Sequence, residues 1–180
     1  MHTLIRKLKG GDQRSIGRAN EVVKAVLKSP DFLPLVVDAL DEDDPVVAMR
    51  AADALEKISR ERPELLTPHG RTLITRAQRS GQAAVRWNLA ETIPRLSLDG
   101  RQRERVFKLL EKFLYDDGRL VRTAAMQGLA DLAKRDSRFL GRVRPLIAWH
   151  TANGSPAMKA RGQRLMRQLD LIGIDALVER

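Results

Sequence analysis

One helical pattern recurs four times along this chain of 180 residues, at intervals of about 37 residues. Each copy begins with an apolar anchor and places small or apolar side chains four, seven and eight positions later. The copies cover residues 47–55, 85–93, 121–129 and 158–166. This spacing puts the apolar side chains on one helix face, and the small ones let a second helix approach closely. A unit of this length cannot bury that face alone, so the sequence predicts stacked helical repeats.

A second helical pattern lies between successive anchors. It is clearest in two segments that lie 37 residues apart. The first contains Val106, Leu109, Leu110 and Phe113, and the second contains Val143, Leu146, Ile147 and His150. Turn residues separate the units at positions 41–45, 79–82, 116–119 and 153–156. The sequence therefore predicts two helices in each unit, which is the organisation of an α-solenoid.

Several residues around the anchors resemble the motif of the HEAT-repeat (armadillo-like) family. They are Asp43 or Asp44 with Pro45 and Val47, then Asp116 with Val121 and Arg122, and Pro156 with Met158 and Lys159. Ala48 departs from the motif, and Ser80 and Gly81 replace its Asp and Pro. The resemblance implies an all-α fold, a right-handed α-α superhelix of about five HEAT-like helix pairs. We expect one domain over residues 1–180, with an N-terminal cap at 1–11 and repeats at approximately 12–40, 41–78, 79–115, 116–152 and 153–180.

Composition limits the classes of protein to consider. The chain has a formal net charge of +10, contains no cysteine and has few aromatic residues. A basic excess of this size favours anionic partners. Neither a disulfide framework nor a thiolate metal site is possible. The N-terminal segment has no apolar signal sequence and no apolar run is long enough for a membrane span, so we expect a cytoplasmic protein and no membrane partner.

Residues with catalytic or metal-binding potential are few. His2, His69 and His150 are far apart in sequence, and His150 occupies the position that Phe113 fills one repeat earlier, which favours a structural, partly buried histidine. The acidic run at residues 41–44 precedes Pro45, where carboxylates cap a helix N-terminus. No nucleotide-binding or nucleophile motif is present. We therefore expect no catalytic residues, metal, cofactor or small-molecule substrate, and predict that the protein is not an enzyme.

A row of cations is the main candidate for a binding surface. Arg101, Arg105, Lys108 and Lys112 recur at helical spacing, on the side opposite Val106. One repeat later their positions hold Arg138, Arg142, Pro145 and Trp149. One repeat earlier the face includes Arg76, and two repeats earlier it includes Phe32 and Leu35. From the N-terminal to the C-terminal repeats, the face therefore changes from apolar to basic.

The HEAT resemblance implies that the second helix of each unit lines a concave surface, which would place this face in a groove. It also implies that Arg86, Arg122 and Lys159, which share one repeat position, form a ladder with acidic residues between repeats.

Two functions fit such a groove. The first is a non-enzymatic scaffold that binds a protein partner, with the arginines contacting an acidic segment and Phe32 and Leu35 an apolar one. The alternative is a nucleic-acid-binding protein that contacts the phosphate backbone, with Trp149 available for stacking. A relative of the HEAT-like DNA glycosylases of alkylation repair ranks third, because no carboxylate matches the catalytic one of that family.

Overall fold

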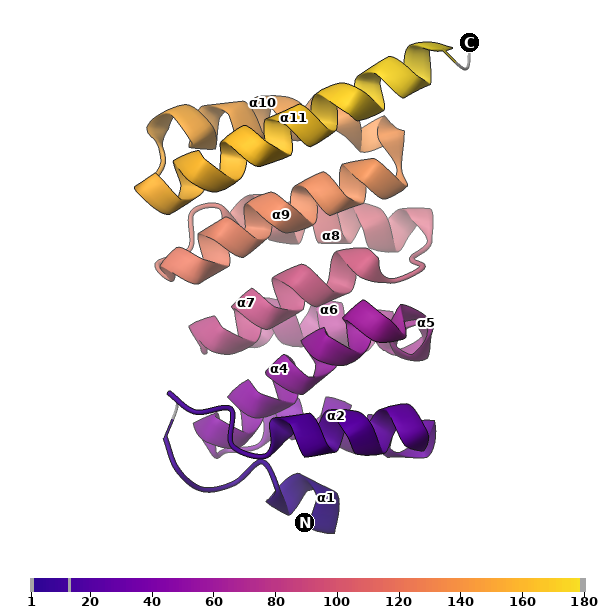
Figure 1. Cartoon of the computed structure of the whole chain (residues 1–180), viewed down its shortest axis with the longest axis vertical. Coiled ribbons are helices and arrows are strands. Elements are labelled where there is room, and N and C mark those ends of the chain that lie inside the picture. The colour runs from indigo at the N-terminus through magenta and orange to yellow at the C-terminus, as the bar shows by residue number, and fades with distance from the viewer. Residues whose placement is uncertain (1, 13, 179–180) are drawn as a thin grey trace.

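The computed structural model describes residues 2–12 and 14–178, and within these residues every regular element is a helix. The helices stack in two layers along the long axis of the molecule (Figure 1). One layer, here called the inner layer, contains α2 (Ala19–Lys28), α4 (Pro45–Glu61), α7 (Ala83–Thr92), α9 (Arg119–Arg135) and α11 (Pro156–Val178). The outer layer contains α3 (Leu33–Asp38), α6 (Gly70–Arg79), α8 (Gly100–Phe113) and α10 (Leu140–Asn153). The molecule is therefore an all-α solenoid, as the sequence predicts.

Short helices complete the repeats. They are α1 (Thr3–Arg6), α5 (Pro63–Leu66) and five single turns of 3-10 helix at Pro30–Phe32, Ala39–Asp41, Thr67–His69, Ile93–Arg95 and Ser137–Phe139. No helix in the described part of the chain is long and apolar enough to cross a membrane. The repeat limits given above stay a prediction, and Met1, Gln13, Glu179 and Arg180, which they include, lie outside the described residues.

Local sequence sets where the long helices begin. The Asp44 side chain accepts a hydrogen bond from the backbone N–H of Val46, and Pro45 is the first residue of α4, so the acidic run ends in a helix cap as predicted. Helix α8 begins with a reciprocal capping box between Asp99 and Gln102. These caps satisfy backbone donors that have no partner inside the helix.

The repeat pattern supplies the core. The anchors Val47, Val85, Val121 and Met158 are all buried, and so are the apolar positions that follow them in α4, α7 and α9. The second pattern is buried as well, from Val36 and Val37 in α3 to Val143 and Ile147 in α10. Gly128 is one of the small positions, and a Cβ there would lie 2.6 Å from the carbonyl oxygen of Ala90 in α7. Close contact between α7 and α9 therefore depends on the small side chains of the repeat.

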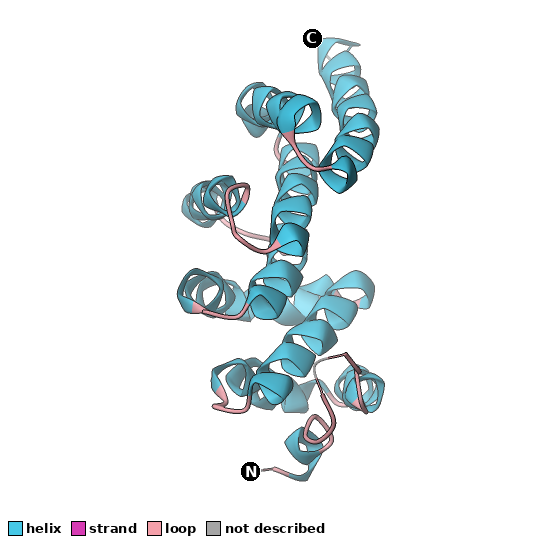
Figure 2. Cartoon of the chain, turned by 90° about the vertical axis from the view of Figure 1, so that its left-hand side faces the viewer, coloured by secondary structure: helices cyan, strands magenta, loops and turns pink. Residues whose placement is uncertain are grey.

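The stack is curved, and the inner layer lies on the concave side (Figure 2). Each inner helix packs directly against the next, whereas α8 and α10 of the outer layer barely touch. Helices on the inside of a bend are closer together than those on the outside. Contact pattern and shape therefore agree that α8 and α10 lie on the convex side.

Candidate functional site

A groove of about 500 Å³ crosses the concave side of the molecule. Its floor comes from the first halves of α4, α7 and α9, and residues 14–16 of the loop between α1 and α2 form one wall. Because three successive inner helices run in the same direction, their N-terminal halves lie next to one another (Figure 1). The groove is therefore a product of the repeat.

Apolar side chains that the core leaves uncovered line this groove. Ile16 is 45% exposed and Leu120 is 57% exposed, although both are large and hydrophobic. Met49 and Trp87 are half-buried and line the same groove. Single exposed apolar residues are common, but a cluster of them in a concave surface is typical of a binding site.

Arg50 fixes the loop that forms the groove wall. Its guanidinium is buried and donates hydrogen bonds to the backbone carbonyl oxygens of Ser15 at 2.9 Å, Leu8 at 2.9 Å and Gly10 at 2.6 Å, with longer bonds to Lys9 and Asp12. Gly17 packs over this guanidinium with a backbone φ of +51°. Arg50 thus replaces the hydrogen bonds that an irregular loop lacks.

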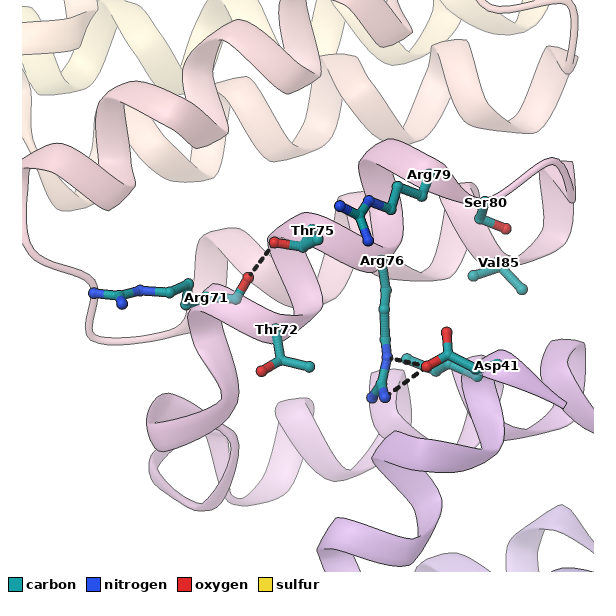
Figure 3. A pocket seen from close by; sticks show the side chains of 9 residues that line it. Asp41, Arg71, Thr72, Thr75, Arg76, Arg79, Ser80 and Val85 are labelled. Carbon is teal, nitrogen blue, oxygen red and sulfur yellow. Dashed lines mark hydrogen bonds and ion pairs between the residues drawn. The ribbon is translucent and has the colours of Figure 1, made fainter.

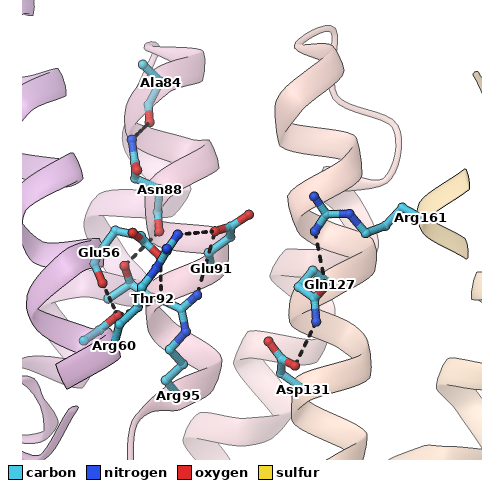
Figure 4. Close-up of polar contacts among 11 residues, drawn as sticks. Glu56, Arg60, Ala84, Asn88, Glu91, Thr92, Arg95, Gln127, Asp131 and Arg161 are labelled. Atoms are coloured by element: carbon cyan, nitrogen blue, oxygen red, sulfur yellow. Dashed lines mark hydrogen bonds and ion pairs between the residues drawn. The ribbon is translucent and has the colours of Figure 1, made fainter. Parts of the chain in front are cut away.

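Polar contacts continue along the inner layer beyond the groove (Figure 4). The buried Glu56 carboxylate accepts hydrogen bonds from Arg60 at 2.6 Å and from Arg95 at 2.7 Å, which connects α4 to the turn after α7. Gln127 of α9 donates to Asp131 and accepts from Arg161 of α11. Burial raises the pKa of Asp131. This network holds neighbouring inner helices in register.

The rim of the groove is positively charged. Arg14 and Arg119 are exposed and line it, and no described carboxylate lies within 4.0 Å of either side chain. Asp53 also lines the groove, but it is neutralised by Lys57 at 2.7 Å. An apolar floor is therefore flanked by two cations that have no ion-pair partner in the described chain.

The basic row predicted for a concave groove lies elsewhere. Arg101, Arg105, Lys108 and Lys112 belong to α8, and Arg138, Arg142 and Trp149 to the segment of η5 (Ser137–Phe139) and α10, all in the outer layer. The placement in a concave groove was wrong, because that layer is on the convex side of the bend (Figure 2). A role of these residues in binding stays a prediction.

The predicted basic residues differ in their contacts. Arg142 pairs with Glu104 at 2.8 Å and lies over the Phe107 ring, and Arg138 pairs with Asp136 at 2.6 Å. By contrast, the four cations of α8 are exposed, and within the described chain no carboxylate lies within 4.0 Å of any of them. Among the basic residues predicted to line a groove, the four of α8 are therefore the ones without an ion pair in the described chain.

Arg76 connects two repeats of the outer layer. It lines a pocket of about 460 Å³, where its guanidinium contacts Asp41 (Figure 3). The same guanidinium also contacts Asp38 and donates to the backbone carbonyl of Val37 at 2.6 Å. These bonds join α6 to the end of α3. Arg76 is thus committed to contacts within the chain.

The two apolar residues predicted for the groove lie beside the core. Phe32 and Leu35 are half-buried and pack against it, and the Phe32 ring lies 5.7 Å from that of His2, centroid to centroid. Phe32 comes directly before α3, and Leu35 lies within this helix of the outer layer. Both are far along the stack from α8 and α10. The N-terminal segment therefore contacts Phe32, one of the two apolar residues predicted to bind a partner.

The three residues of the predicted ladder have different surroundings. Arg86 makes a two-point ion pair with Asp116 of the next repeat, at 2.7 and 2.9 Å. Arg122 donates instead to the backbone carbonyl of Asp116. Lys159 is exposed, and within the described residues it has no ion pair. Asp116 thus ties α7 to the turn before α9.

His150 is buried, as expected from its match with Phe113. Its Nε2 atom has no hydrogen-bond partner among the described residues. The described residues also contain no group of three His, Asp or Glu side chains arranged to hold a metal ion.

Sequence reasoning missed the residues that line the groove. A signal was present, because the residue before each anchor is apolar in all four repeats: Val46, Ala84, Leu120 and Ala157. Met49 and Trp87 also share a position, two residues after their anchors. When a position outside the buried stripe is apolar in every repeat, the stacked repeats bring these side chains together. Such a pattern predicts a second apolar surface.

Comparisons with known proteins identify the fold. No family model matches the chain, and no curated protein does. An engineered protein of known structure superposes with a TM-score of 0.65 and 17% identity, over 93% of this chain and 78% of its own. Computationally designed armadillo repeat proteins for modular peptide recognition superpose with a TM-score of 0.63 and 15% identity, over 92% of this chain and 80% of theirs. The fold is therefore an armadillo- or HEAT-like helical repeat.

Proposed function

We propose that this protein is a non-enzymatic scaffold that binds an extended segment of a partner protein in the concave groove. The observation that carries this proposal is the cluster of Ile16, Met49, Trp87 and Leu120, two exposed and two half-buried apolar side chains from the loop and three inner helices that line one groove. Burial of such side chains, aromatic ones above all, contributes most of the free energy of association at protein interfaces.

The charges around the groove define the partner segment. Arg14 and Arg119 have no ion pair within the described chain, so carboxylates next to an apolar anchor would complement them. The acidic segment expected from sequence is retained in this proposal, whereas its site moves from the outer helices to the inner ones. A similar use is stated for the designed armadillo repeats that share this fold, whose purpose is modular peptide recognition.

Selection from a random peptide library tests the proposal. The wild-type chain is the bait, and the variant Trp87→Ala serves for counter-selection. We expect enriched peptides to carry a large apolar residue with Asp or Glu beside it. Trp87→Ala should lower the affinity for such a peptide, measured by calorimetry, by about tenfold or more, which is the effect of losing a central aromatic anchor.

The second tryptophan provides a matched control. Trp149→Ala removes an exposed ring from the convex side and should leave peptide affinity unchanged. Arg119→Glu should weaken binding most at low salt. Enriched peptides that bind wild type and Trp87→Ala equally well would place the site outside the groove and contradict the proposal.

A further inference from the structure

The row of cations on α8 leads to a pair of exposed aromatic rings. Arg101, Arg105, Lys108 and Lys112 share one face of the helix, and Tyr115 follows shortly after its last turn. Tyr115 is 66% exposed, and Trp149 of α10, which occupies the position of Lys112 one repeat later, is 54% exposed. Charge and aromatic surface therefore adjoin at the C-terminal end of α8 and on α10.

A buried histidine joins the two rings. The His150 ring lies 5.2 Å from that of Tyr115 and 4.7 Å from that of Trp149, centroid to centroid, and meets both edge to face. All three side chains line a pocket of about 340 Å³ together with Arg122 and Asn153. The rings are thus held in place by packing while much of their surface is open to solvent.

The protonation of His150 bears on what this pocket accepts. Burial, and secondly the nearby Arg122, lowers the pKa of His150, so the imidazole is neutral at neutral pH. Its Nε2 has no hydrogen-bond partner among the described residues. The pocket therefore offers aromatic rings and a neutral polar ring, which match a flat heterocycle better than a carboxylate.

We propose that this convex face binds single-stranded nucleic acid, with successive phosphates on the four α8 cations and a base against Tyr115 or Trp149. Cations that follow the backbone and aromatic rings that stack on bases are the two features that single-strand binding combines. A duplex would use the cations, but its paired bases could not reach the rings. This surface is separate from the concave groove, so the inference does not depend on the proposed function.

Fluorescence anisotropy of a labelled single-stranded oligonucleotide of roughly 15 nucleotides tests the phosphate contacts, a length that suits a site of this kind. Four contacts predict that the logarithm of the association constant falls with that of salt concentration with a slope of about −3. Arg105→Glu with Lys108→Glu should weaken binding by about tenfold or more at low salt. Lys24→Glu with Lys28→Glu makes the same change in net charge on α2 and should have little effect, since both lysines are exposed and lie in the other layer.

The rings are tested separately. Tyr115→Ala and Trp149→Ala should each lower the affinity for the single strand by about fivefold or more, which is the low end of the effect of losing one stacked base. Both side chains are exposed, so the variants should fold, which circular dichroism checks. In a Trp87→Phe background Trp149 is the single tryptophan, and its fluorescence should be quenched on binding.

Three results would overturn the inference. The first is a dissociation constant above about 100 µM at low salt, which is weaker than ordinary non-specific binding. The second is equal affinity for a duplex together with no effect of the ring variants, which would mean phosphate contact alone. The third is equally tight binding of a polyglutamate peptide, which would point to an acidic protein segment.

Discussion

Arg50 is the residue on which the concave groove most depends. A guanidinium cannot lose its proton in a protein, so its burial requires partners for its donors, and here these are backbone carbonyls of residues 8–15. Removal of the guanidinium would leave several carbonyls without donors and would release the loop that carries Ile16. Groove shape and loop structure are therefore linked through one side chain.

Gly17 and Gly10 allow a test of this link. Both have a positive φ, but a Cβ at Gly17 would lie 2.7 Å from the Arg50 Cζ atom, whereas none of the neighbouring atoms lies within 4 Å at Gly10. We expect Gly10→Ala to cost about 1–2 kcal/mol for the left-handed backbone alone. Gly17→Ala should cost at least about 1 kcal/mol more, because the loop must move off the guanidinium. Urea unfolding measures both, and equal losses would contradict the described contact.

Asp136 supplies a prediction about pH. The Arg138 guanidinium, and then that of Arg103, hold the pKa of this buried carboxyl well below its usual value, although burial opposes them. A lowered carboxyl pKa contributes stability that is complete above about pH 4, the pKa in the unfolded chain, and is lost as pH falls through the folded value. Asp136→Asn keeps a side-chain oxygen for the cap but removes the charge that faces both guanidinium groups, so it should reduce the free energy of unfolding by about 1 kcal/mol at pH 7.

The same variant should approach wild type as pH falls below 4. Urea unfolding at pH 7, 5, 4 and 3 measures the difference between the two proteins. A difference that stays constant over this range would show that ionised Asp136 contributes nothing.

The environment of some single residues could be predicted from the sequence, and that of others could not. Burial of the anchors and of His150 was predictable, because repeated positions share an environment. Arg50 was not, since a charged residue in an amphipathic helix usually faces solvent, and its partners lie more than thirty residues earlier in a loop without a repeat. Trp149 was identified from sequence, whereas Tyr115 beside it was not, because it follows the helix and has no repeat equivalent.

At the scale of elements, close packing of α7 on α9 depends on Gly128. A Cβ there would meet the Ala90 carbonyl at 2.6 Å and Leu110 at 3.0 Å. Gly128→Ala should therefore destabilise by about 1–3 kcal/mol, the usual cost of overpacking, in spite of the better helix propensity of alanine.

Gly141 is the matched control, because it lies in the first turn of α10 with no neighbouring atom within 4 Å. Gly141→Ala should stabilise by up to about 1 kcal/mol. Thermal or urea unfolding separates the two cases. A neutral or stabilising effect of Gly128→Ala would show that the two helices are not in close contact.

Helices and their order were largely predictable because the anchors, caps and turn residues agree at each repeat. Pro45 and the preceding carboxylates marked the start of α4, and the second apolar pattern marked α8 and α10. The pattern did not show which layer is concave. Curvature depends on how closely helices approach within each layer, and this follows from small side chains such as Gly128 acting across repeats.

At the scale of the whole molecule, the two faces differ in chemistry. The concave side combines an apolar floor with two cationic side chains at its rim, while the convex side carries most of the basic row first recognised in the sequence. The net charge of +10 could predict anionic partners but could not assign them to a face. Two binding surfaces on opposite sides would let one chain hold a protein segment and a second ligand together.

A map of backbone amide chemical shifts, recorded by NMR during titration with a peptide enriched in the selection described above, tests whether the concave groove binds the partner segment. We expect the largest changes at residues 14–17, in the first halves of α4 and α7 and at residues 118–121, with the Trp87 indole N–H among them. We expect little change in α8 and α10. Shifts concentrated in α8 and α10, with Trp87 unaffected, would contradict the assignment of the protein-binding site to the concave groove.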